Sequence, residues 1–116
     1  MPFIRLQTNI AVEDSARHRL IREASSLIAR MLNKPEPYVM VSVETECDML
    51  FGGNDTPLAY VELKSIGLPG DQTTRYSETL CAFIARELKI PQERVYIEFA
   101  DVERNLWGWN AKTFQR

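Results

Sequence analysis

The chain has 116 residues, of which 45% are hydrophobic and 26% are charged. These proportions are typical of a soluble globular protein, and the length suits one domain with a single core. The formal net charge of −2 provides no electrostatic reason to expect DNA, RNA or anionic lipid as a partner. No segment has the pattern of a signal peptide or the length of a membrane span. We therefore expect one cytoplasmic domain over residues 1–116.

The chain opens with MPFIRLQTNI, in which Pro2 precedes a predicted strand at residues 3–9. A proline cannot donate to a strand ladder, but removal of Met1 would leave its ring nitrogen as a free secondary amine. An apolar pocket or a nearby cation would lower the pKa of that amine and make it a usable base near neutral pH. Pro2 is therefore either a catalytic base or an ordinary chain start.

An internal repeat organises the chain. Residues 29–43, ARMLNKPEPYVMVSV, align without a gap with residues 85–99, ARELKIPQERVYIEF. The same offset pairs the apolar faces of two predicted helices, one at about 14–33 and one from Asp71, its expected N-cap, to about Lys89. The remaining predicted strands are at 38–44, 58–66 and 95–101. The repeats therefore cover about 2–46 and 58–101, joined by a turn at FGGND and followed by a tail at 102–116.

Helical crossovers join parallel strands with a right-handed sense, so two such repeats predict a four-stranded sheet with both helices on one face. This fold is an α+β two-layer sandwich. Strand periodicity places Val95, Ile97 and Phe99 toward the helices, and Tyr96 and Glu98 on the opposite face. No third helix is available to cover that partly apolar face, so we predict self-association.

The tail contains Trp107, Trp109 and Phe114. We expect these large apolar side chains to pack on a neighbouring subunit or to line a pocket. Lys34 follows the first helix, where its positive charge could stabilise the C-terminal end of the helix dipole. If Pro2 is nearby, the same ammonium could instead bind a substrate carboxylate. His18 is the only histidine, so no histidine metal cluster or Ser/His/Asp triad can be assembled. We expect no metal and no cofactor.

A set of segments in order along the chain is specific in combination: MPFI, NKPEPYVMVSV, FGGN, SIG, RVYIEFAD and WGWNAKTF. Together they resemble the macrophage migration inhibitory factor family of the tautomerase superfamily, over essentially the whole chain. The resemblance implies a subunit of two βαβ units, a homotrimer with active sites at the subunit interfaces, and a cofactor-free keto–enol tautomerase. Its implied substrates are phenylpyruvate-like 2-oxo acids and, in some members, dopachrome.

The resemblance also implies roles for individual residues. Pro2 matches the family's catalytic N-terminal proline, and Lys34 matches the lysine that meets the substrate carboxylate. The other matching positions are Ile66 with its backbone in the pocket, Tyr96 from across the subunit boundary, and Trp109 and Phe114 as aromatic pocket or rim residues.

The sequence departs from better-known members at three places. Glu98 stands where an asparagine commonly contacts substrate, and its carboxylate would repel an anionic substrate and raise the pKa of the proline. Trp107 replaces a smaller aliphatic residue and could narrow the pocket entrance. The CxxC motif of the animal cytokine is absent, since residues 58–61 read LAYV, so the thiol oxidoreductase activity ascribed to that motif is not expected.

Two principal functions follow from this sequence. The first is a tautomerase in which Pro2 takes a proton from the carbon beside a 2-oxo acid carbonyl while Lys34 orients the carboxylate. The second is a cytokine-like signalling or protein-binding trimer with weak or vestigial activity, for which release without a signal peptide would be needed. A third, related possibility is decarboxylation or hydration of a small unsaturated acid.

Overall fold

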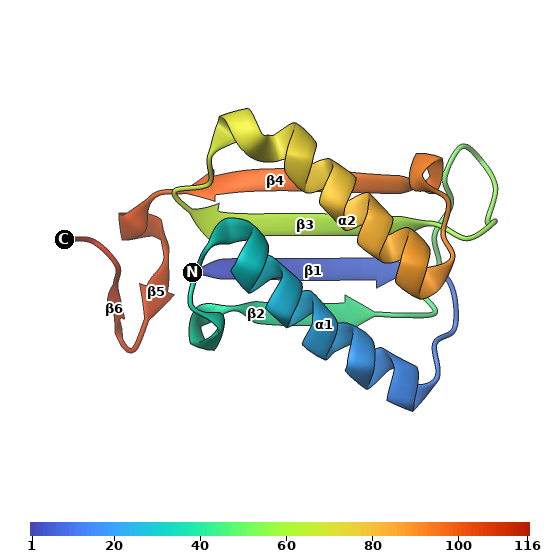
Figure 1. Cartoon of the computed structure of the whole chain (residues 1–116), viewed down its shortest axis with the longest axis horizontal. Helices are drawn as coiled ribbons and strands as arrows, with labels where there is room; N and C mark the ends of the chain where they lie inside the picture. The colour runs from blue at the N-terminus through green and yellow to red at the C-terminus, as the bar shows by residue number, and fades with distance from the viewer.

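A four-stranded mixed sheet with two helices on one face forms the body of the structure, a computed structural model that describes residues 1–116 (Figure 1). The main elements are β1 (Pro2–Thr8), α1 (Asp14–Leu32), β2 (Met40–Glu44), β3 (Ala59–Ile66), α2 (Thr73–Leu88) and β4 (Val95–Val102). The short elements are the hairpin strands β5 (Gly108–Trp109) and β6 (Lys112–Thr113) and the 3-10 helices η1 (Glu36–Tyr38), η2 (Gly70–Gln72), η3 (Gln92–Arg94) and η4 (Arg104–Leu106). The predicted two-layer α+β fold is confirmed.

The sheet has the strand order β2-β1-β3-β4. Each repeat contributes a parallel pair, β1 with β2 and β3 with β4, and the two repeats meet through the antiparallel pair β1 and β3. In this register Pro2 is opposite Ser65, Phe3 is opposite Met40, and Ile66 is opposite Val102. The start of β1, the start of β2 and the ends of β3 and β4 therefore lie at one end of the sheet.

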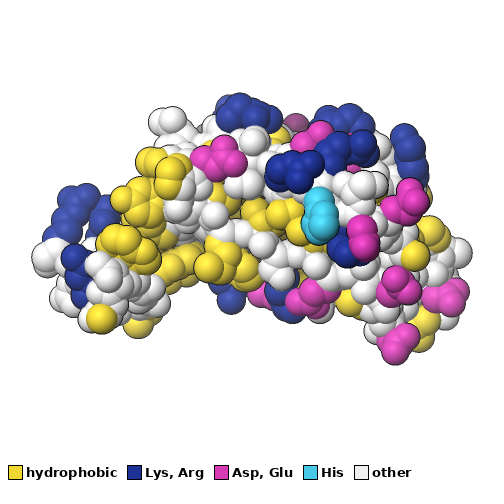
Figure 2. Space-filling model, turned by 90° about the horizontal axis from the view of Figure 1, so that it is seen from below, with side chains coloured by type: hydrophobic (Ala, Val, Ile, Leu, Met, Phe, Trp, Pro, Cys, Tyr) yellow, Lys and Arg dark blue, Asp and Glu magenta, His cyan; other side chains and the backbone are white.

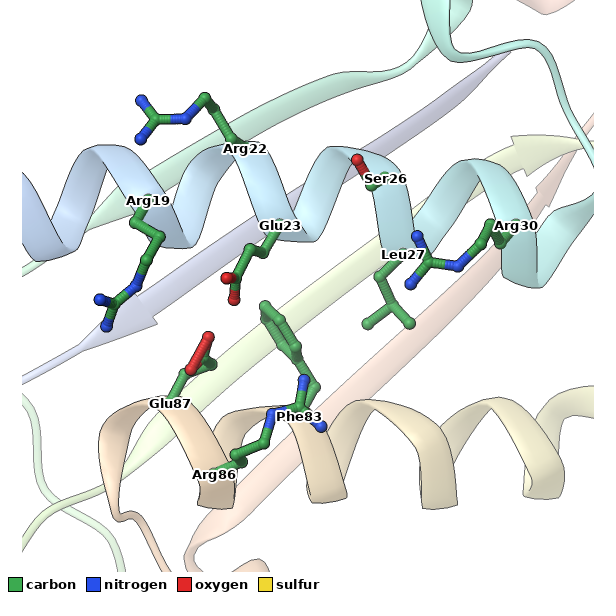
Figure 3. A pocket seen from close by; sticks show the side chains of 9 residues that line it. All are labelled: Arg19, Arg22, Glu23, Ser26, Leu27, Arg30, Phe83, Arg86 and Glu87. Atoms are coloured by element: carbon green, nitrogen blue, oxygen red, sulfur yellow. The ribbon is translucent and has the colours of Figure 1, made fainter.

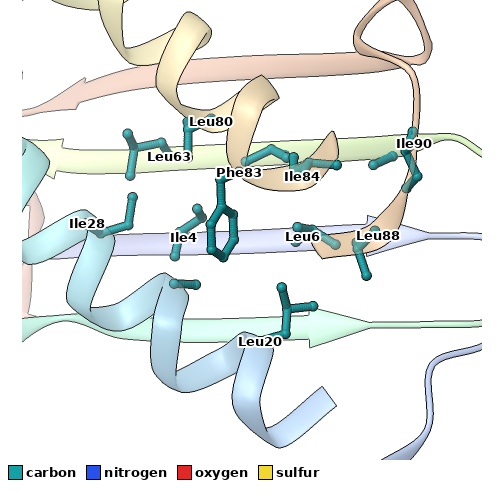
Figure 4. Close-up of a cluster of buried hydrophobic side chains, with 13 residues drawn as sticks. Ile4, Leu6, Leu20, Ile28, Leu63, Leu80, Phe83, Ile84, Leu88 and Ile90 are labelled. Atoms are coloured by element: carbon teal, nitrogen blue, oxygen red, sulfur yellow. The ribbon is translucent and has the colours of Figure 1, made fainter. Parts of the chain in front are cut away.

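The core lies between the helices and the helix-facing side of the sheet (Figure 4). Ile28 of α1 is completely buried, and Ile4, Leu63 and Phe83 around it are at most 3% exposed. The two helices bury residues at the three- and four-residue spacing that puts side chains on one face of a helix. Val95, Ile97 and Phe99 of β4, which were predicted to face the helices, pack against this core, as do Val41 and Val43 of β2.

The repeat extends to the turns. Asn33 and Lys89 both end their helices in the left-handed conformation, with φ of 53° and 58°, and both are followed by a proline and a 3-10 helix. The predicted capping role of Asp71 is wrong, because α2 begins after Gln72, which makes no side-chain cap. Asp71 instead lies inside η2, whose extra turn delays the start of the helix.

The opposite face of the sheet is open, and Tyr96 and Met40 on it are 65% and 66% exposed. Arg5 at its centre forms an ion pair with Glu62 and a weaker one with Glu44.

The tail leaves β4 and forms the β5–β6 hairpin beside the N-terminus (Figure 1). Hydrophobic side chains gather on the surface toward this end of the molecule (Figure 2). Neither α1 nor α2 has the length and apolar character that a membrane crossing requires.

Candidate functional site

A pocket of about 240 Å³ lies at the end of the sheet where β1 begins. Three segments that are distant in sequence form it: the N-terminus, the connection between α1 and β2, and the C-terminal hairpin. Its lining residues are Met1, Pro2, Pro37, Tyr38, Val39, Met40, Trp107, Gly108, Trp109 and Phe114. The pocket is mostly apolar, which suits a small ligand with an aromatic or aliphatic body.

Aromatic rings form the outer wall of this pocket. The ring of Trp109 is stacked on Phe114 with centroids 5.8 Å apart and meets Tyr38 edge-on at 6.3 Å. The hairpin holds these rings, because Asn110 and Ala111 at its turn have φ of 53° and 61° and the Phe114 amide donates to the carbonyl of Trp107. The predicted pocket positions of Trp109 and Phe114 are thus on one wall, and Trp107 lines the same pocket.

Pro2 is buried at the inner end of the pocket and is held in β1 opposite Ser65. Met1 precedes it and lines the same pocket, so the nitrogen of Pro2 is a tertiary amide as long as Met1 is attached. The surroundings lower the pKa of the Met1 α-amine, first through burial and then through the positive charges of Lys34 and Arg104. An amine at this end of the chain is therefore biased toward its neutral, basic form.

Lys34 and Ile66 meet beside this end of the sheet. The Nζ atom of Lys34 donates to the carbonyl oxygen of Ile66 at 3.5 Å. The left-handed turn at Asn33 positions Lys34 there, and the backbone amide of Lys34 donates to the carbonyl oxygen of Ala29 at 2.9 Å. Ile66 is buried and contributes to an adjoining groove of about 450 Å³ that also contains Arg104. Neither residue lines the aromatic pocket itself.

Tyr96 and Glu98 are not brought together with Pro2 within one chain. Both lie exposed on β4, where Glu98 accepts a hydrogen bond from the Tyr60 hydroxyl at 3.3 Å. Tyr60 is the neighbour of Tyr96 in the sheet, whereas Pro2 is opposite Ser65. Five residues of extended strand separate Tyr60 from Ser65, which is about 17 Å. Either these two residues serve the pocket of another copy, or they do not serve a pocket.

Sequence reasoning missed Arg104, which is one of the two cations acting on the terminal amine. Arg104 lies outside the repeat, in η4 directly after β4. No sequence motif marks Arg104, and only the fold brings the end of β4 to the end of the sheet where Pro2 lies. Residues 38–44 were predicted as strand, but Tyr38 belongs to η1 and β2 begins only at Met40, and both residues line the pocket.

No group of three or more His, Cys, Asp or Glu side chains is arranged to hold a metal ion. Cys47 and Cys81 are half-buried and unpaired. This end of the sheet combines the chain's terminal amine, in the aromatic-walled pocket, with Lys34 at the Ile66 carbonyl and Arg104 in the adjoining groove.

The chain is similar to known proteins in sequence and in fold. The chain is 40% identical to a macrophage migration inhibitory factor homolog from Brugia malayi over 98% of this chain and 99% of the relative, and 35% identical to the factor from Xenopus tropicalis over the same shares. A crystal structure of a homologue from Prochlorococcus marinus superposes with a TM-score of 0.91 at 45% identity, covering 97% of this chain and 99% of the other. The structure from Trichinella spiralis has a TM-score of 0.88 at 30% identity, covering 96% and 98%. The family model described as macrophage migration inhibitory factor matches residues 1–115, and the chain belongs to that family.

Proposed function

We propose that this protein is a cofactor-free keto–enol tautomerase of phenylpyruvate-like 2-oxo acids, with Pro2 as its base once Met1 is removed. The observation that carries the proposal is the placement of Pro2. It is buried at the inner end of an aromatic-walled pocket, at the point where burial, Lys34 and Arg104 lower the pKa of a terminal amine. Membership of the family supports the same reaction.

In the proposed reaction, the neutral Pro2 amine takes a proton from the carbon next to the substrate carbonyl, and the resulting ammonium gives a proton to the carbonyl oxygen as the enol forms, which restores the neutral amine. In the reverse direction the amine takes the proton from the enol oxygen and returns a proton to that carbon. A base with a pKa near the working pH performs both steps well, because it is neither locked as ammonium nor too weak to accept a proton. The apolar pocket walls strengthen these interactions by excluding water.

Lys34 would bind the substrate carboxylate, and the backbone at Ile66 would form the adjoining edge of the site. The ammonium of Lys34 already contacts the Ile66 carbonyl, so both groups lie at one place. Trp109 and Phe114 would contact the aromatic body of the substrate from the hairpin. A carboxylate beside an ammonium gains a charge-assisted hydrogen bond, which orients the carbon acid toward Pro2.

We extend the proposal to a homotrimer with each site at a subunit interface. Within one chain Tyr96 is offset from Pro2 by about 17 Å along the strand direction and Glu98 by about 10 Å, and both lie on β4, with β3 between them and β1, so a second copy would supply them. The exposed Met40 and Tyr96 on the uncovered face give such a copy apolar surface to bury. Sedimentation equilibrium should return a three-chain mass, and a stable monomer would oppose this part of the proposal.

Glu98 is expected to limit turnover of anionic substrates. Its carboxylate would repel the substrate carboxylate and would raise the pKa of the Pro2 amine, favouring the protonated form. This residue also supports the second candidate, a protein-binding trimer with weak residual activity, because a poorly matched pocket need not turn over substrate efficiently.

The decisive experiment is phenylpyruvate ketonisation by protein whose mass shows that Met1 is absent, measured across pH. Pro2→Gly should reduce kcat/KM by about 10²- to 10⁴-fold, the usual contribution of a positioned acid or base. Glu98→Asn should increase turnover. Activity that survives in Pro2→Gly would rule out the amine mechanism, and no activity in Met1-free protein or in Glu98→Asn would favour the protein-binding candidate.

A further inference from the structure

A second groove, distant from the aromatic pocket, runs along the outer surface between α1 and α2 (Figure 3). Its volume is about 670 Å³, within the range of small-molecule sites. The side chains that line it are Arg19, Arg22, Glu23, Ser26, Leu27, Arg30, Phe83, Arg86 and Glu87. Four guanidinium groups thus accompany two carboxyl groups, in a chain whose overall formal charge is −2.

The four arginines are not used in ion pairs. The ion pairs of the structure involve only Arg5, Arg17 and Lys64 as cations. In Figure 3, Arg19 and Arg30 extend from α1 along the groove and Arg86 extends from α2, whereas Arg22 points away from α2. Arg30 and Arg86 therefore present free donors on either side of the same groove.

Phe83 holds Arg86 in place. The guanidinium carbon of Arg86 lies 5.5 Å from the centroid of the Phe83 ring, which is a cation–π contact. Phe83 itself is 3% exposed and belongs to the core, so its ring is fixed. A guanidinium that is already oriented loses less conformational entropy when it binds a ligand.

The two carboxyl groups oppose each other across the groove rather than pairing with the arginines. Glu23 of α1 and Glu87 of α2 face each other (Figure 3), and the nearby Glu23 carboxyl together with burial raises the pKa of Glu87, against the opposing charges of Arg19 and Arg86. The four guanidinium groups outnumber the two carboxyl groups, so the lining of the groove has an excess of positive charge.

We propose that the α1–α2 groove is a binding site for a small polyphosphate anion, held mainly by Arg30 and Arg86. Planar guanidinium groups match phosphate oxygens in bidentate geometry. The arginines of α1 extend over eleven residues from Arg19 to Arg30, about 16 Å of helix, so a chain of phosphates fits this spread better than a single one. The site is separate from Pro2 and does not depend on the proposed tautomerase activity.

Titration with inorganic tripolyphosphate, followed by calorimetry and by amide chemical shifts, tests this site. We expect saturable binding with shifts confined to the facing turns of α1 and α2. Arg30→Gln and Arg86→Gln should each weaken binding about tenfold or more, as expected for loss of a charged hydrogen bond. Arg22→Gln removes the same charge from a side chain that points away, and it should weaken binding less than about threefold.

Glu87→Gln provides a test in the opposite direction. It removes a carboxyl group from the groove, so it should tighten tripolyphosphate binding, most clearly at a pH where the pair is ionised. The substituted side chains other than Glu87 are exposed, so thermal melts of these variants should match the parent. Absence of saturable binding, or equal losses in Arg22→Gln and Arg30→Gln, would overturn the proposal, because the second result would indicate a response to net charge alone.

Discussion

Ile28 offers the sharpest test of how the core supports the pocket end of the sheet. Its side chain has no exposed surface and lies among Ile4 and Leu63 on the strands that hold Pro2 (Figure 4). Ile28→Ala deletes three buried carbons, about 2.4 kcal/mol at ~0.8 kcal/mol per methylene. The cavity left behind adds to this, and we expect a total loss of about 3.5 kcal/mol.

The assay is thermal unfolding at matched protein concentration, because any association couples stability to concentration. An unfolding entropy of about 2.1 cal/mol/K per residue over 116 residues converts the loss to a Tm decrease of about 14 °C. Ile21→Ala is the matched control, since it makes the same deletion on the same helix at a half-buried position. Its expected loss is about 1 kcal/mol. Equal losses at the two positions would refute the assignment of Ile28 to the tightly packed core.

Three further predictions concern charge and the pocket. Arg104→Gln removes a cation that lowers the pKa of the Met1 amine, so we expect the pKa of the Pro2 amine in Met1-free protein to rise and the acid-side limb of kcat/KM to move to higher pH. Arg5 lowers the pKa of Glu62 in the folded protein below its unfolded value of 4.5. The pair therefore stabilises the fold at pH values above that unfolded pKa, and this stabilisation is lost as the pH falls through the lowered pKa of Glu62 in the folded state. The Tm of Glu62→Gln should therefore depend less on pH below about 4.5. Trp107→Val widens the pocket that Trp107 lines, and KM for phenylpyruvate should fall while the pH profile stays unchanged.

Each of these has a clear contrary outcome. An unchanged pH limb in Arg104→Gln would mean that its charge does not reach the reacting amine. A full acid-side Tm loss in Glu62→Gln would assign that loss to other carboxylates. An unchanged or raised KM in Trp107→Val would mean that the indole contacts the substrate rather than obstructing it.

Much of the architecture could be predicted from sequence because it depends on local periodicity. Apolar spacing predicted both helices, and the repeat at 29–43 and 85–99 predicted two equivalent halves, which in the structure also share left-handed helix ends at Asn33 and Lys89. Strand alternation assigned Ile97 to the core side and Tyr96 to the open side. Asp71 was misassigned because an N-cap and the first turn of a 3-10 helix favour the same polar residues.

The site depends on longer-range contacts than sequence periodicity can specify. The family resemblance made Pro2, Lys34 and Ile66 candidate site residues, but the register of β1 against β3 decided that they lie at one end of the sheet. The charge of Arg104 on the terminal amine and the arginine groove between the helices depend on packing between segments that are far apart in the chain. Net charge sums over all residues and cannot report where charges gather, so only the tertiary structure could place a cationic groove on an acidic chain.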